Sequence, residues 1–181
     1  MVLAFLVAGA ILGWFTANPR ENAAPHVDAL LVLSTQDGAH DEAYRLAEAG
    51  VTDLLIVSVP DGASDSLCGN APKRVESVCF TPEPVTTQGE AMGGTVIARE
   101  HDAQSLGVLT FNHHVERSRL LVERCWAGPV YMYEFQPVRR ALGYVYDFVY
   151  AMSAYGKAFL TPACDAPPPD WLQTPIDRIK D

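Results

Sequence analysis

The sequence has few basic residues. Thirteen Lys and Arg stand against 22 Asp and Glu, which gives a formal net charge of −9 at pH 7. A field of this sign repels phosphate backbones, and no cluster of Lys or Arg offsets it locally. Nucleic acid is therefore not expected as a partner.

Several motifs of common enzyme classes are missing. There is no Gly-x-Ser-x-Gly elbow, so a lipase-type serine nucleophile is not indicated. The turn at 34–38 lacks a Gly-x-Gly-x-x-Gly run, so we expect no nucleotide cofactor. His113 and His114 are adjacent and would diverge by about a third of a turn on a helix. Such a pair is poorly placed to bind one metal ion, and we expect no metal site.

Residues 1–17 contain no charged side chain. Their length is at the short limit for a spanning helix, which needs about 20 apolar residues. We expect residues 1–19 to anchor the chain in the plasma membrane, with the globular domain outside the cytoplasm. A cleaved signal peptide and a buried first helix of a soluble domain are the alternatives. The absence of basic residues before this segment leaves its orientation and its retention open.

None of the four cysteines lies in a Cys-x-x-Cys pair, and their spacings match no zinc finger or ribbon. An even number of this kind favours two disulfides in an exported protein. Four free thiols in a cytoplasmic protein are the alternative. We expect Cys68 to pair with Cys79, and Cys125 to pair with Cys164.

Apolar runs alternate with helical patterns along most of the chain. Continuous apolar runs are typical of strands buried on both faces. The expected strands cover 28–34, 53–59, 75–80, 106–111 and 130–135, and the expected helices cover 39–49, 86–100, about 113–124 and a segment that begins at Pro137. This alternation predicts an α/β fold, a Rossmann-like three-layer sandwich with a mostly parallel sheet. The domain would span 27–160, between the apolar segment 1–19 and a Pro-rich tail at 161–181.

Polar residues follow the expected strand at 106–111, at the edge where open α/β sheets bind ligands. His114 and Arg117 are three residues apart and would share one face of a helix. Asn112 is placed to cap that helix, and the positive end of the helix dipole adds to the arginine. The combination suits a phosphate or a carboxylate. The alternative is a surface helix whose arginines pair with Glu116 and Glu123.

Two other turns at the same edge carry hydroxyl groups. Thr86, Thr87 and Glu90 could bind a sugar or position a water molecule, although an ordinary capping box explains the same residues. After the first strand, Ser34 and Thr35 offer hydroxyl and amide donors.

The chain resembles the YdcF/SanA/ElyC-like family, a group classed as a domain of unknown function. The resemblance rests on the strand at 28–34, on Thr86-Thr87-Gln-Gly-Glu90-Ala91 and on Val108-Leu-Thr-Phe-Asn-His-His-Val-Glu-Arg117. It covers roughly residues 27–155. The similarity is strongest to an actinobacterial-type branch, in which Arg-Cys follows the His-x-x-Arg helix, here Arg124-Cys125. Two positions depart from the family pattern, because Ser34-Thr35-Gln36 replaces a Gly-rich turn and Phe111 replaces a Ser or Thr.

The resemblance implies a Rossmann-like domain behind one membrane helix, linked to the cell envelope. By carry-over, its site is Thr87, Glu90, His114 and Arg117, with the loop after the first strand. In the resulting hypothesis Arg117 binds an anionic envelope precursor, His114 transfers a proton, and Glu90 orients a water or hydroxyl beside Thr87. Further substrate contacts would come from Ser34, Thr35, Thr86 and Asn112. A non-catalytic module of the envelope and a soluble cytoplasmic domain are the alternatives.

Overall fold

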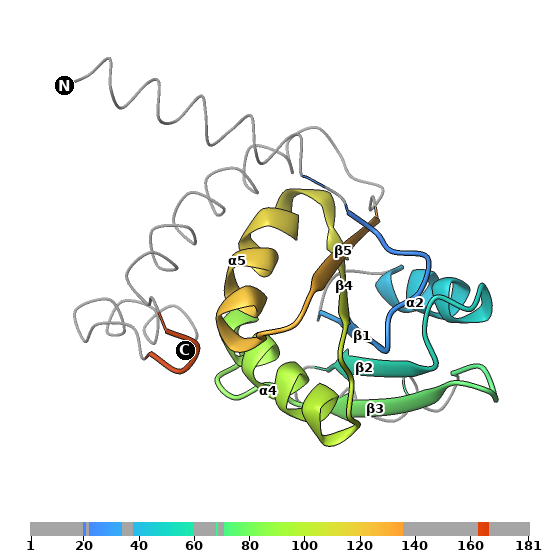
Figure 1. Cartoon of the computed structure of the whole chain (residues 1–181), viewed down its shortest axis with the longest axis horizontal. Coiled ribbons are helices and arrows are strands. Elements are labelled where there is room, and N and C mark those ends of the chain that lie inside the picture. Colours follow the sequence, from blue (N-terminus) through green and yellow to red (C-terminus); the bar gives the residue numbers. More distant parts are fainter. Residues whose placement is uncertain are drawn as a thin grey trace, which may run out of the picture.

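Five parallel strands form one sheet, in the order β3-β2-β1-β4-β5 (Figure 1). The computed structural model describes residues 20, 22–33, 38–59, 68, 71–135 and 163–166. The strands are β1 (Ala29–Val32), β2 (Leu54–Ser58), β3 (Glu76–Phe80), β4 (Leu106–Phe111) and β5 (Val130–Phe135). All five expected strands are present. The sheet is parallel throughout because each of its four pairings is parallel.

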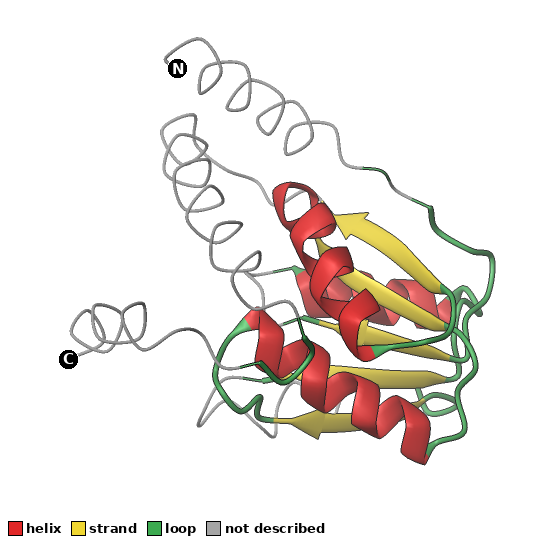
Figure 2. Ribbon diagram, turned by 60° about the vertical axis from the view of Figure 1, so that its left-hand side comes forward, coloured by secondary structure: helices red, strands yellow, loops and turns green. Residues whose placement is uncertain are grey.

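Helices cover both faces of the sheet (Figure 2). On one face α2 (Ala39–Glu48) packs against Leu30, Val32 and Leu55. On the other face, α4 (Thr87–Glu100) and α5 (Val115–Cys125) share a core with Leu31, Ile56 and Val108. The fold is therefore the three-layer α/β sandwich that the alternating pattern predicts.

Several expectations fall on residues that the structure does not describe. They are the apolar segment 1–19, the turn at 34–37, the helix from Pro137 and most of the tail at 161–181. Among the described residues, no helix has the length and apolarity needed to cross a membrane.

Helix α4 lies very close to the sheet because glycines face it. A Cβ on Gly94 would come within 2.5 Å of the Leu31 side chain, and one on Gly93 within 2.5 Å of the Phe80 ring. At Gly89 the obstacle is backbone, since a Cβ there would lie 1.9 Å from the Pro84 carbonyl oxygen. These contacts set the depth at which the first turn of α4 sits on the sheet.

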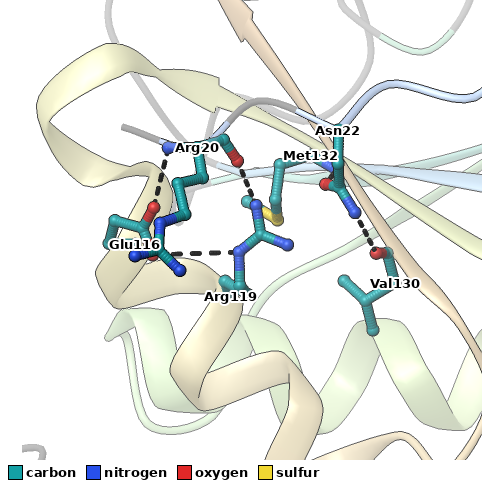
Figure 3. Close-up of polar contacts among 6 residues, drawn as sticks. All are labelled: Arg20, Asn22, Glu116, Arg119, Val130 and Met132. Carbon is teal, nitrogen blue, oxygen red and sulfur yellow. Dashed lines mark hydrogen bonds and ion pairs between the residues drawn. The ribbon is translucent and has the colours of Figure 1, made fainter. Parts of the chain in front are cut away.

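The segment before the first strand is fixed to β5 and α5 (Figure 3). The Asn22 side chain accepts a hydrogen bond from the Met132 N–H (2.9 Å) and donates one to the Val130 carbonyl (3.2 Å). One amide thus satisfies two backbone groups of the edge strand, as a neighbouring strand would. Two residues earlier, the Arg20 N–H donates to Glu116 (2.7 Å) and the Arg20 carbonyl accepts from Arg119.

Both expected disulfides are present. Cys68 pairs with Cys79, with 6.2 Å between their Cα atoms, and Cys125 pairs with Cys164 at 4.9 Å. The second bond ties 163–166 to the end of α5. The same short segment is held at the start of α4, where the Gln88 amide donates to the carbonyls of Cys164 (3.0 Å) and Ala166 (2.9 Å).

We expect Gly89→Ala to destabilise the protein more than Gly93→Ala. The first substitution meets a carbonyl oxygen, whereas the second meets an aromatic ring that can shift. Overpacking of this kind costs about 1–3 kcal/mol. Urea denaturation of the full-length protein in detergent measures both variants. Equal stability of Gly89→Ala and the unmodified protein would show that the turn before α4 is not constrained as described.

Candidate functional site

The strand order places a topological switch point between β1 and β4. The chain leaves β1 toward α2 on one face and leaves β4 toward α5 on the opposite face. In sheets of this type the two diverging connections open a crevice at the carboxyl ends of the strands, and ligands bind there. His114 ends the short helical turn η1 (Asn112–His114) that directly follows β4. The candidate histidine therefore lies at the position that the topology favours for a ligand.

The His114 ring is held through one of its two nitrogens. Its Nδ1 lies 3.0 Å from the Ser118 hydroxyl oxygen and 3.3 Å from the Thr110 hydroxyl oxygen. One face of the ring stacks on Phe111, with centroids 4.8 Å apart and an interplanar angle of 26°. Only 9% of the residue is exposed, and both hydroxyl-bearing residues are fully buried. Such support fixes the direction of the other nitrogen, Nε2.

His114 is neutral at neutral pH. Burial lowers its pKa well below 6.5, and the positive charges of Arg117 and His113 lower it further. Arg117 acts on His114 electrostatically, which agrees with the proximity that their three-residue spacing predicts. A neutral ring can donate one hydrogen bond and accept one without bringing its own charge into the site.

Arg117 and Arg119 have different environments, although they are two residues apart. Arg117 is 7% exposed and packs on the sheet side of α5. Arg119 lies 3.9 Å from Glu116 and donates to the Arg20 carbonyl. The sequence left open whether these arginines serve a site or only pair on the surface. Arg119 takes the pairing role, whereas Arg117 is buried beside His114.

Strand register connects Glu90 to the same region. Val32 pairs with Val57 and with Leu109, so the next residues, Ser58, Leu33 and Thr110, form one row across three strands. This row faces α4 and α5, because Leu33 and its neighbours two residues earlier belong to that core.

Glu90 lies over that row. Gly94 packs on Leu31, and Glu90 is one helical turn nearer the carboxyl edge on the same face of α4. Glu90 is 5% exposed. Buried charges of opposite sign, Glu90 and Arg117, thus lie in the opening turns of two adjacent helices, and each has an interaction partner.

The way in which α4 is capped shows that Glu90 is not part of a capping box with Thr86. Thr86 is the N-cap, and its hydroxyl oxygen accepts the Gly89 N–H at 3.2 Å. A capping box uses the third helical position, which is Gly89 here. Glu90 is the fourth, so the box that the sequence offered as an alternative does not form around Thr86. Thr87 is the first residue of α4 and is half-buried.

Asn112 does not cap α5 as expected. The helix begins three residues later, at Val115, and no side chain caps it. The Asn112 side-chain oxygen instead accepts from the His113 N–H (2.7 Å) and lies 3.1 Å from His113 Nδ1. His113 also packs on Phe111, at 4.2 Å between ring centroids. Phe111 therefore supports both histidine rings.

The remaining expected residues are Ser34 and Thr35, which lie outside the described residues. In the described part of the chain, no group of three or more His, Cys, Asp and Glu side chains is arranged to hold a metal ion. Glu116, the acidic residue nearest to His113 in sequence, bonds the Arg20 N–H and lies near Arg119.

Comparisons of the chain with protein-family models, with curated proteins and with solved structures found no match.

Three hydroxyl groups at this edge were not singled out from the sequence. Thr110 and Ser118 contact His114, and Ser58 has a buried hydroxyl with no hydrogen-bond partner among the atoms of the structure. The signal for Ser118 is its spacing, since it lies one helical turn after His114. Thr110 and Ser58 end apolar runs, and only the strand order brings them into one row.

We expect His114 to remain neutral at a pH at which His101 is protonated. Its folded pKa is lowered, so between that value and about 6.5 the unfolded chain binds a proton that the folded chain does not. Stability should therefore fall as the pH drops below about 6.5, and His114→Asn should remove this component. His101 is the internal control, because the Ile97 carbonyl and Glu76 raise its pKa.

NMR titration of the five histidines measures each midpoint, and denaturation at several pH values measures the stability. A midpoint for His114 at or above that of His101 would contradict the burial of the ring and the electrostatic effect of Arg117 described above.

Proposed function

We propose that this chain is a membrane-anchored domain of the cell envelope, related to the YdcF/SanA/ElyC-like family, that binds an anionic envelope precursor. The observation that carries the proposal is the pairing of a fixed, neutral His114 with a buried Arg117 at the switch point. A guanidinium and a neutral N–H donor are groups that bind phosphate or carboxylate oxygens. Glu90, on the neighbouring helix, would orient a water or hydroxyl against the bound group.

The docking of Arg20 supports a lipid-linked precursor. Arg20 directly follows the apolar segment 1–19, and its N–H bonds Glu116 in the first turn of α5. An anchor ending at residue 19 would hold this turn at the membrane surface. His114 and Arg117 are within two residues of Glu116, so the candidate site would lie within about one helical turn of the headgroup region. A phosphate carried by a membrane lipid would meet it there.

The two disulfides support the extracytoplasmic location. Disulfides form and persist in oxidising compartments and are rare in the cytosol. Both pairs lie within the described domain, one on each face of the sheet. A domain exported behind its own N-terminal segment would acquire both.

We expect Arg117→Gln to weaken anion binding by about 10–100-fold, because a charge-assisted hydrogen bond contributes about 1.5–3 kcal/mol. The full-length protein in vesicles with and without a polyprenyl phosphate, and in detergent with inorganic phosphate, provides the assay. Arg117→Lys keeps the charge and tests the fork geometry if the glutamine variant fails to fold.

Arg45→Gln is the matched control, since Arg45 pairs with Glu42 on α2, on the opposite face of the sheet. Equal loss in the control, or no binding by the unmodified protein to either probe, would contradict the proposal. If binding occurs and the lipid phosphate is also turned over, His114→Asn separates an enzyme from a binding module, because only turnover then depends on proton transfer.

We expect the cysteines of the full-length protein to be blocked in intact cells. A membrane-impermeant maleimide should label the protein only after a reductant is added, and the protein should sediment with the membrane fraction. Labelling of free thiols after cell lysis without reductant would instead indicate the cytoplasmic alternative.

A further inference from the structure

Two buried hydroxyls meet at one nitrogen of His114. The Thr110 and Ser118 oxygens lie 3.3 and 3.0 Å from Nδ1, and neither residue has any exposed surface. Within the described part of the chain, Nδ1 is the hydrogen-bond partner recorded for both hydroxyls. Thr110 comes from β4 and Ser118 from the second turn of α5, so the sheet and the helix approach the ring together.

The two hydroxyl protons favour one tautomer of the His114 ring. Each hydroxyl carries one proton that needs an acceptor, and Nδ1 is the acceptor at hand. If Nδ1 carried the ring proton, both hydroxyl protons would be buried without an acceptor. If Nδ1 is unprotonated, its lone pair accepts one of them. A buried donor without a partner costs about 1–3 kcal/mol, so the tautomer with the proton on Nε2 is favoured.

We propose that Thr110 and Ser118 are positioning residues that hold His114 in the Nε2–H tautomer and so present an N–H donor to an oxyanion. This inference deepens the proposed function and rests on it for the ligand, although the tautomer is a property of the protein alone. Nε2 is on the opposite side of the ring from the two hydroxyls. Its proton therefore points away from them.

The tautomer restricts the chemistry of the resting site. Without a lone pair at Nε2, that nitrogen is not a nucleophile, a general base or a metal ligand. It donates to an acceptor, and the acceptor that a neighbouring Arg117 favours is an anionic oxygen. The ligand class is thus a deprotonated phosphate or carboxylate, bound by one neutral and one charged donor. In the resting site His114 therefore acts as a hydrogen-bond donor.

The test is ¹⁵N NMR of the imidazole rings in the full-length protein, with His114 assigned through His114→Asn. We expect a protonated-type resonance for Nε2 and an unprotonated, hydrogen-bonded resonance for Nδ1. Thr110→Val and Ser118→Ala, singly and together, should move the Nδ1 resonance toward its position without a hydrogen bond. Thr110→Ser, which keeps the hydroxyl, should restore it.

Thr95→Val is the matched control, because it removes another buried hydroxyl, which bonds the Met92 carbonyl. It should leave the His114 resonances unchanged. A proton on Nδ1 in the unmodified protein would overturn the proposal, and this result needs no variant to fold. An Nδ1 resonance that does not move when Thr110→Val and Ser118→Ala are combined would also overturn it.

Adding inorganic phosphate separates this inference from the proposed function. We expect the Nε2–H proton resonance to shift with phosphate in the unmodified protein. If His114 is the Nε2–H tautomer but its Nε2–H resonance does not shift with phosphate or polyprenyl phosphate, the assignment of the positioning residues is supported. Their link to an oxyanion is then overturned. An Nδ1–H tautomer in a protein that binds phosphate would overturn this inference and leave the proposed function standing.

Discussion

The position of β4 beside β1 determines where the polar groups of the candidate site lie. Between β3 and β4 the chain must pass β2 and β1, and α4 makes this crossing on one face of the sheet (Figure 1). The helix after β4 then packs beside α4, whereas the helix after β1 lies on the other face. The connections from β1 and β4 therefore diverge, and the groups at the end of β4 lie where sheets of this type bind ligands. A different strand order would separate His114 from the turn that carries Glu90.

The close packing of α4 on the sheet buries charged side chains at the candidate site. Because Gly93 and Gly94 let the helix approach the sheet, its fourth residue, Glu90, is carried into the interior. Arg117 enters the same layer from α5. Charges buried there interact more strongly than charges in water, since the surrounding medium screens them less. The neutral state of His114 follows from the same conditions, because burial and a nearby guanidinium both oppose a second positive charge.

The sequence predicts the elements of the fold well because they depend on local patterns. Apolar runs and, at 75–80, an alternating pattern predict all five strands, and both expected cysteine pairs form disulfides. The start of α5 is predicted too early, because Phe111 packs against both histidine rings and supports a tighter turn that no local pattern encodes. The sequence does not predict the roles of Thr110 and Ser118, for a related reason. Each looks like an ordinary residue of an apolar strand or helix, and the partner that gives its hydroxyl a function is fixed only by tertiary structure.

Two segments that flank the sheet in sequence, Arg20 and 163–166, are attached to the helices of the candidate site. Before the domain, Arg20 is bound to Glu116 and Arg119 on α5. After it, the Cys125–Cys164 bond and the Gln88 amide fasten 163–166 to both α5 and α4. The helices α4 and α5, which supply Glu90 and Arg117, are thus held by packing on the sheet and by these covalent and polar contacts. Groups fixed in this way need little reorganisation when a ligand binds, so more of the interaction energy remains as affinity. An oxidising compartment would preserve this constraint, which links the place where the domain folds to the geometry of the site it carries.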